Sequence, residues 1–71
     1  MVKQKIVNQM QLDIQNLVVK KLWKINENGN KVKVRRDAES EYSIYFDGHY
    51  ITTLTDWKDT FELAKTLLLS L

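Results

Sequence analysis

The two glycines of this chain constrain its fold most strongly, because each follows a short polar residue between runs of β-branched and aromatic side chains. The two dipeptides are Asn28-Gly29 and Asp47-Gly48. A type I′ turn needs positive φ at both central residues, which Asn-Gly and Asp-Gly adopt most readily. The sequence therefore predicts two β-hairpins with two-residue turns.

A two-residue turn fixes which residues of a hairpin lie opposite each other. The first turn pairs Leu22 with Arg35, Trp23 with Val34, Lys24 with Lys33 and Ile25 with Val32. The second turn pairs, on one face, Phe46 with His49, Ile44 with Ile51 and Tyr42 with Thr53, and on the other face Tyr45 with Tyr50 and Ser43 with Thr52. Each hairpin then has one apolar face, and residues 37–40 join the hairpins into a four-stranded antiparallel meander.

Apolar residues at helical spacing flank the hairpins on both sides. After Asp56, which can cap a helix, these positions are Trp57, Phe61, Ala64, Leu68 and Leu71. Before the hairpins they are Ile6, Val7, Met10, Ile14, Leu17 and Val18. We expect the C-terminal helix to cover the apolar sheet face, which is formed by Trp23, Ile25, Val32, Val34, Ile44 and Ile51.

The predicted fold is a single α+β domain over residues 1–71, in the order α-β-β-β-β-α, with one helix at each end of the meander. One alternative stays open, because apolar residues fall four apart at Ile6, Met10, Ile14, Val18 and Leu22. A first helix that continued to about residue 25 would give the order α-β-β-β-α. We favour the hairpin, since Val18, Val19, Trp23 and Ile25 prefer strands.

The chain lacks the residues of the common catalytic and metal sites. With no Cys and one His, it cannot supply the ligands of a conventional zinc site. The one candidate for nucleophilic catalysis is Ser43 with Asp47 and His49, and the predicted register places Ser43 and His49 on opposite faces of the sheet. Glycine-rich phosphate-binding motifs are absent from the sequence. We therefore expect no enzymatic activity, no metal and no cofactor.

Charge is distributed unevenly along the chain, although the net charge is only +2. The first 36 residues hold nine of the eleven Lys and Arg, and the last 35 hold seven of the nine Asp and Glu. The predicted sheet face away from the C-terminal helix gathers Lys24, Lys31, Lys33, Arg35, Tyr45 and Tyr50, beside Leu22 and Leu54. Because cations contact phosphates and rings stack on bases, this face is a candidate surface for nucleic acid or another partner. In the alternative, the N-terminal helix covers this face and its apolar residues form a second small core.

The N-terminal segment offers a second candidate surface. Val7, Met10, Ile14 and Leu17 follow the 3-4-3 spacing of residues that face a partner helix. Because a chain of this size builds only a small core, we expect this stripe to mediate self-association as a homodimer. The alternative is that the stripe packs on the chain's own sheet.

The apolar runs of the chain are short. None exceeds three residues, whereas a membrane-spanning helix needs about 20. The start of the chain also lacks the apolar segment of a secretory signal. Together with the absence of cysteine, these features favour a cytoplasmic protein that does not cross a membrane.

A short chain rich in Lys, Asn and Ile, with an amphipathic start and the segment from Tyr42 to Ile51, resembles small uncharacterised accessory proteins of phages and prophages in low-GC Gram-positive bacteria. The resemblance covers the whole chain and includes no catalytic motif. It implies a compact protein that binds and modulates a host or phage macromolecule. We therefore expect a non-enzymatic binding module with a protein partner. The alternative is a nucleic-acid-binding protein that uses the basic and aromatic sheet face.

Overall fold

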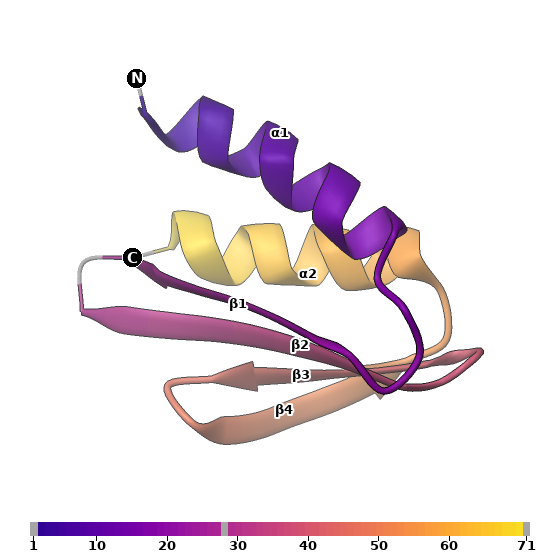
Figure 1. Cartoon of the computed structure of the whole chain (residues 1–71). Helices are drawn as coiled ribbons and strands as arrows, with labels where there is room; N and C mark the ends of the chain where they lie inside the picture. Colours follow the sequence, from indigo (N-terminus) through magenta and orange to yellow (C-terminus); the bar gives the residue numbers. More distant parts are fainter. Residues whose placement is uncertain (1, 28, 71) are drawn as a thin grey trace.

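The fold consists of two helices and four strands (Figure 1). The computed structural model describes residues 2–27 and 29–70. In chain order its elements are α1 (Val2–Gln15), β1 (Leu22–Glu27), β2 (Asn30–Ala38), β3 (Glu41–Phe46), β4 (His49–Leu54) and α2 (Trp57–Leu69). The strands form one antiparallel sheet in the order β1-β2-β3-β4. The predicted α+β fold is confirmed, and the alternative with a longer first helix is wrong.

A short loop over residues 16–21 separates α1 from β1, and Arg36 of β2 holds it in place. Arg36 Nη1 donates to the Leu17 carbonyl at 2.7 Å, and the Arg36 backbone N–H donates to the Lys21 carbonyl at 3.1 Å. Lys20 has a positive φ of 70°, a conformation that does not occur in a right-handed helix. The loop therefore ends the helix before its four-residue periodicity can continue to Leu22.

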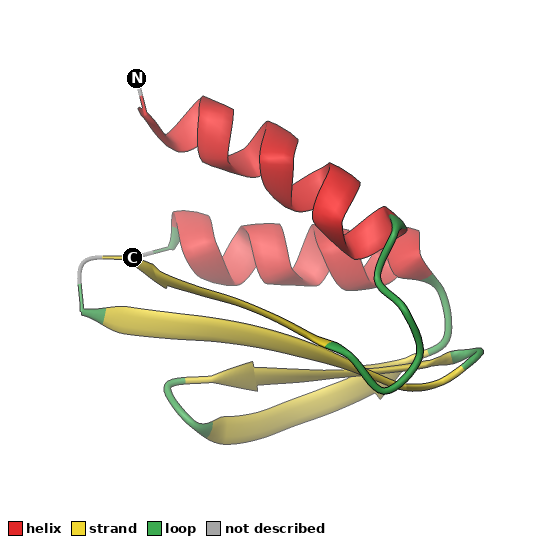
Figure 2. Cartoon of the chain, in the orientation of Figure 1, coloured by secondary structure: helices red, strands yellow, loops and turns green. Residues whose placement is uncertain are grey.

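Both helices lie on the same side of the sheet (Figure 2). α2 packs across β2, β3 and β4, and α1 packs against α2. The core lies on this inner side and consists of Val7, Met10, Ile14, Leu17, Val32, Val34, Tyr42, Ile44, Phe61, Ala64 and Leu68. Asp56 caps α2 as predicted, since its carboxylate accepts a hydrogen bond from the Lys58 N–H at 3.3 Å. The predicted helix position Leu71 lies outside the described residues.

The first hairpin has the predicted register. β1 and β2 pair from Leu22 opposite Arg35 to Ile25 opposite Val32 and beyond, and Gly29 in the turn has a φ of 82°. Asn28 lies outside the described residues. The apolar and basic faces of this hairpin are therefore the predicted ones.

In the second hairpin the turn is as predicted, but a β-bulge at Ile51 shifts the register by one residue. Asp47 and Gly48 have φ values of 51° and 84°, as a type I′ turn requires. The predicted pairs next to the turn are confirmed, namely Tyr45 with Tyr50 and Phe46 with His49. The other three predicted pairs are wrong, and the observed pairs are Ile44 with Thr52, Ser43 with Thr53 and Tyr42 with Leu54. Consequently Leu54 packs against the core, and Ile51, which the sequence places in the core, is 44% exposed.

Candidate functional site

The side of the sheet opposite the helices is open, and we call it the outer face (Figure 2). Its side chains are Leu22, Lys24 and Asn26 of β1, Lys31, Lys33, Arg35 and Asp37 of β2, Glu41, Ser43 and Tyr45 of β3, and Tyr50 and Thr53 of β4. Neither described helix covers this face, and Leu22 and Tyr50 are 48% and 58% exposed. The alternative in which the N-terminal helix covers it is therefore wrong.

All six candidate residues of the predicted partner surface lie on this outer face. They are Lys24, Lys31, Lys33, Arg35, Tyr45 and Tyr50, and none of them is buried. The predicted neighbour Leu22 belongs to the same face. The prediction for Leu54 is wrong, because the bulge at Ile51 turns Leu54 towards the core.

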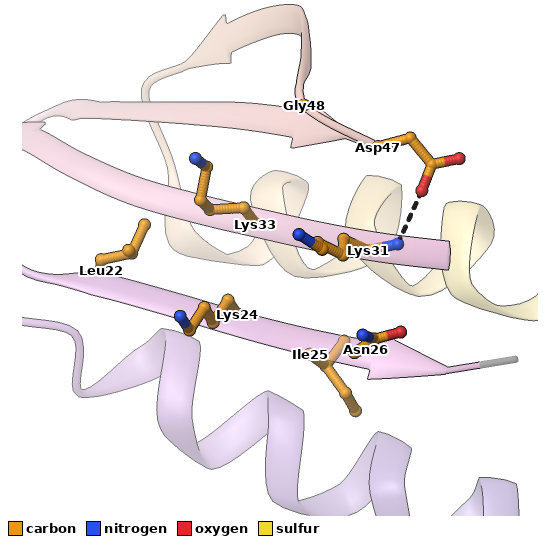
Figure 3. A pocket seen from close by; sticks show the side chains of 8 residues that line it. All are labelled: Leu22, Lys24, Ile25, Asn26, Lys31, Lys33, Asp47 and Gly48. Carbon is orange, nitrogen blue, oxygen red and sulfur yellow. Dashed lines mark hydrogen bonds between the residues drawn. The ribbon is translucent and has the colours of Figure 1, made fainter. Parts of the chain in front are cut away.

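Three lysines form a cluster on β1 and β2 (Figure 3). Lys24 lies directly opposite Lys33, and Lys31 is two residues from Lys33 on the same side of β2. None of the three makes an ion pair with a described carboxylate. They line a hollow of about 640 Å³ whose other walls come from Leu22, Ile25, Asn26, Asp47 and Gly48. Because like charges directly opposite each other destabilise a strand pair, this cluster is unfavourable in the free protein.

Asp47 also lines the hollow, and it forms two hydrogen bonds with the backbone of Lys31. Its Oδ1 accepts a hydrogen bond from the Lys31 backbone N–H at 2.7 Å, and its own N–H donates to the Lys31 carbonyl at 2.8 Å. In Figure 3 the amine of Lys31 points away from this carboxylate. The two hydrogen bonds therefore fasten the turn between β3 and β4 to the start of β2, and the Asp47 carboxylate makes no ion pair with the three lysines.

Tyr45 and Tyr50 form the aromatic part of the outer face. Their ring centroids lie 5.8 Å apart with an interplanar angle of 66°, an edge-to-face contact. The Nζ atom of Lys33 lies 5.0 Å from the Tyr45 ring centroid, and the Cζ atom of Arg35 lies 6.0 Å from it. Tyr45 thus connects the cations of β2 to Tyr50 of β4, and the basic and aromatic side chains form one continuous surface.

A polar network fixes Arg35 and Tyr50 at one end of the outer face. The carboxylate of Asp37 accepts a hydrogen bond from Arg35 Nε at 2.6 Å and another from the Ser43 hydroxyl. The Thr53 hydroxyl lies 3.2 Å from Ser43 Oγ and 2.7 Å from the Tyr50 hydroxyl. Hydrogen bonds from Ser43 and Arg35 hold the pKa of Asp37 below its ordinary value, and the Asp37 carboxylate raises the pKa of Arg35. Arg35 is therefore paired with a carboxylate, unlike the three lysines.

The sequence pattern does not predict this network. The predicted register pairs Ser43 with Thr52, whereas the bulge brings Thr53 beside Ser43. In addition, β2 continues to Ala38 and so includes Asp37, which the sequence assigns to the connection between the hairpins. One signal was present, because Thr52 and Thr53 place a hydroxyl opposite Ser43 in either register.

The predicted self-association stripe lies inside the molecule. Val7, Met10, Ile14 and Leu17 are all buried in the core, where α1 packs against α2. The stripe therefore packs within its own chain, as in the alternative prediction, although its main neighbour is α2. Self-association through these residues would require α1 to leave the core. Homodimer formation as such stays a prediction.

The structure separates the residues that could resemble a catalytic set. Ser43 is bonded to Asp37 near one end of β3, whereas His49 begins β4 and lies opposite Phe46. Among the described residues no three His, Cys, Asp or Glu side chains are grouped to hold a metal ion. The expectation that the protein is not an enzyme stays a prediction.

The chain matches no protein family, no curated protein and no solved structure. Neither α1 nor α2, the two helices of the described residues, is long and apolar enough to span a membrane. A proposal of function therefore depends on the geometry and charge of the outer face.

Proposed function

We propose that this protein is a non-catalytic binding module that binds nucleic acid through the outer face of its sheet. One observation carries the proposal: Lys24, Lys31 and Lys33 lie together on an uncovered sheet face without a described carboxylate partner. Tyrosines lie beside this cluster. Cations that neutralise phosphates, next to rings that can stack on bases, are the two components of a nucleic-acid surface.

The lysine cluster is better explained by binding than by folding. Lys24 directly opposite Lys33 lowers the stability of the free protein, and no described carboxylate forms an ion pair with either lysine. A polyanion would remove this repulsion and release the counterions that surround it in solution. Local arrangements that oppose stability are concentrated at functional sites.

The distribution of charge over the two sides of the molecule supports the same partner. On the helical side of the sheet, the carboxylates of Asp56, Asp59 and Glu62 are largely offset by Lys58 and Lys65 of α2, and Lys65 Nζ lies 3.1 Å from Glu62 Oε1. On the outer face, Asp37 is bonded to Arg35 and Ser43, and Glu41 lies opposite Ala38, at the far end of β3 from Lys33. Asp47 lines the hollow together with three cations, Lys24, Lys31 and Lys33. An approaching polyanion therefore meets a positive potential on the outer face.

The sequence favours a protein partner because the chain is small, lacks catalytic motifs, begins with an amphipathic helix and carries a net charge of only +2. The apolar side of that helix is occupied in the core, so the outer face is the open surface whose chemistry indicates a partner. A protein with an acidic surface becomes the better candidate if nucleic acid fails to bind. The likeness to phage accessory proteins and the cytoplasmic location stay predictions.

A salt titration of nucleic-acid binding tests the proposal. Fluorescence anisotropy would measure the affinity for labelled DNA and RNA of about 20 nucleotides, longer than the roughly 4–16 that one small domain covers. If three lysines contact phosphates, log affinity should fall with log salt with a slope of about −2 to −3, at roughly −0.7 to −0.9 per contact. Failure to bind at about 50 mM salt would overturn the proposal.

A matched pair of variants locates the interface. Lys24→Gln with Lys33→Gln removes two charges from the outer face, and Lys5→Gln with Lys58→Gln removes two exposed charges from the helices. We expect the first variant to lose most of the affinity and to reduce the salt slope by nearly two contacts. The second variant should bind almost as the wild type does. Equal losses in both variants would mean that net charge, and not the outer face, controls binding.

A further inference from the structure

We infer that the ligand of the outer face is a single-stranded nucleic acid, with phosphates on the lysines of β1 and β2 and an unpaired base stacked on Tyr50 of β4. The inference rests on the proposed function and goes further, because it selects one form of nucleic acid and assigns separate roles to the two halves of the face.

The outer face is divided into two halves that lie side by side. The lysines without carboxylate partners are on β1 and β2, and the tyrosines are on β3 and β4. Tyr45 joins the halves, since its ring contacts Lys33 on one side and Tyr50 on the other. A strand that lies across the sheet would therefore meet amines for its backbone and a ring for its bases within one surface.

Tyr50 is the ring that remains available for a base. Lys33 and Arg35 both approach the Tyr45 ring, which is only partly exposed. Tyr50 is 58% exposed and contacts Tyr45 in an edge-to-face arrangement, so it is not stacked face to face on its neighbour. A large part of its ring is thus open to a ligand.

Two contacts hold Tyr50 in place before any ligand binds. Its hydroxyl lies 2.7 Å from the Thr53 hydroxyl, and its ring lies against Tyr45. Thr53 is in turn linked through Ser43 to Asp37. A side chain that is already ordered loses less conformational entropy when it binds, so this network favours Tyr50 as a stacking surface.

A duplex could use the lysines but not the Tyr50 ring. Paired bases are stacked on one another and expose only their edges in the grooves, whereas unpaired bases are free to stack on aromatic side chains. Side chains that insert between the base steps of a duplex are apolar wedges. Tyr50 instead has its hydroxyl bonded to Thr53 on the same strand. The ring therefore adds affinity only for a single strand.

The test compares one labelled DNA strand of about 20 nucleotides, free and paired with its complement, on three forms of the protein. The wild type should bind the single strand more tightly than the duplex. Tyr50→Val keeps a strand-forming residue without a ring, and it should weaken single-strand binding about tenfold, within the range for loss of one stacked base, with little change for the duplex. Tyr50→Phe keeps the ring and should retain most of the affinity.

The shift of the Tyr50 ring proton resonances provides a second measurement on the wild-type protein. Stacking of a base on the ring should move these resonances upfield when the single strand is added, and the duplex should not. This readout does not depend on how well the variants fold.

The possible failures are distinguishable. If the duplex binds as tightly as the single strand, or Tyr50→Val weakens both equally, the single-strand inference is wrong and the proposed function stands. The same conclusion follows if the Tyr50 resonances do not move. If the wild type binds neither form at about 50 mM salt, both the inference and the proposed function are wrong.

Discussion

The inner and outer faces of the sheet are built from alternate residues of the same strands. On β2, Val32 and Val34 are fully buried, whereas Lys33 between them belongs to the outer face. On β3, Ile44 is fully buried, and the next residue, Tyr45, contacts Lys33. Strand alternation therefore places the core and the proposed interface one residue apart.

The two faces also differ in whether the chain itself supplies partners for their side chains. Among the described residues, every buried side-chain nitrogen and oxygen has a hydrogen-bond partner. On the outer face, Lys24 and Lys33 repel each other and the ring of Tyr50 is exposed. The inner face therefore stabilises the fold, whereas the lysine cluster and the Tyr50 ring of the outer face leave interactions for the proposed ligand to make.

The largest expected effect is the difference in stability between variants of two adjacent residues of β3, Ile44 and Tyr45. Ile44→Ala leaves a cavity in the core and should lower the free energy of unfolding by about 2–5 kcal/mol. Because a core of this size supplies only about 3–5 kcal/mol, we expect this variant to be largely unfolded. Tyr45→Ala removes contacts on an open face and should cost no more than about 1 kcal/mol.

The circular dichroism spectrum shows whether Ile44→Ala folds at all, and urea unfolding followed by circular dichroism measures the free energy of unfolding of Tyr45→Ala. Ile44→Val is the control for the core, because it removes one methyl group and should cost about 0.5–1.5 kcal/mol. A cost for Tyr45→Ala as large as that for Ile44→Ala would show that the outer face is part of the core, and it would contradict the separation of the two faces.

A smaller effect of opposite sign is expected in the lysine cluster. Lys24→Glu places a carboxylate opposite Lys33, so it should raise the free energy of unfolding by about 0.2–1 kcal/mol while it weakens nucleic-acid binding. Thermal unfolding at low and high salt measures the gain, which screening should reduce. Lys24→Gln removes the repulsion without adding an attraction, so its free energy of unfolding should lie between those of the wild type and Lys24→Glu. A loss of stability in Lys24→Glu would mean that the cluster does not oppose folding.

The smallest effect concerns acid stability and Asp37. The pKa of this carboxyl is lowered in the folded protein, chiefly by the Ser43 hydroxyl and then by Arg35, so the ionised form favours folding. This contribution is present above the unfolded pKa of about 3.9 and is lost as the pH falls through the lower folded pKa. Ser43→Ala should therefore reduce stability at neutral pH, and its difference from the wild type should shrink below about pH 4.

Unfolding measured across this pH range tests the role of Asp37. The control introduces Ser43→Ala into an Asp37→Asn background, where no carboxyl is left to titrate and the effect of the serine should no longer change with pH. A difference between Ser43→Ala and the wild type that stays constant down to acidic pH would show that Ser43 does not act through Asp37.

The two hairpins show what could and could not be predicted from the sequence. In the first, Ile25 and Val32 fit the core face in the register of the turn, and no competing register places apolar residues as well. In the second, the order Ile51-Thr52-Thr53-Leu54 fits two registers, since each sends one aliphatic residue and one threonine inward. Local pattern could not decide between them, so the bulge and the network around Thr53 were not predicted.

Local sequence pattern is also insufficient for the two candidate surfaces, the outer face and the apolar stripe of the N-terminal helix. The residues of the outer face follow from strand alternation, which is why the six candidates were predicted. Whether a helix covers them depends on the path of the loop over residues 16–21, which Arg36 fixes from a distant part of the chain. The spacing of Met10 and Ile14 likewise predicts a helix partner but cannot say whether that partner belongs to the same chain.

The bulge at Ile51 has a consequence for solubility. β4 is an edge strand, and its six residues include no Lys, Arg, Asp or Glu to discourage pairing with the edge of another molecule. A regular, uncharged edge rich in β-branched and aromatic residues is a template for aggregation. The extra residue interrupts the hydrogen-bond ladder and bends the strand. The bulge that changes which side chains lie on the outer face therefore also disfavours pairing of β4 with a strand of another molecule.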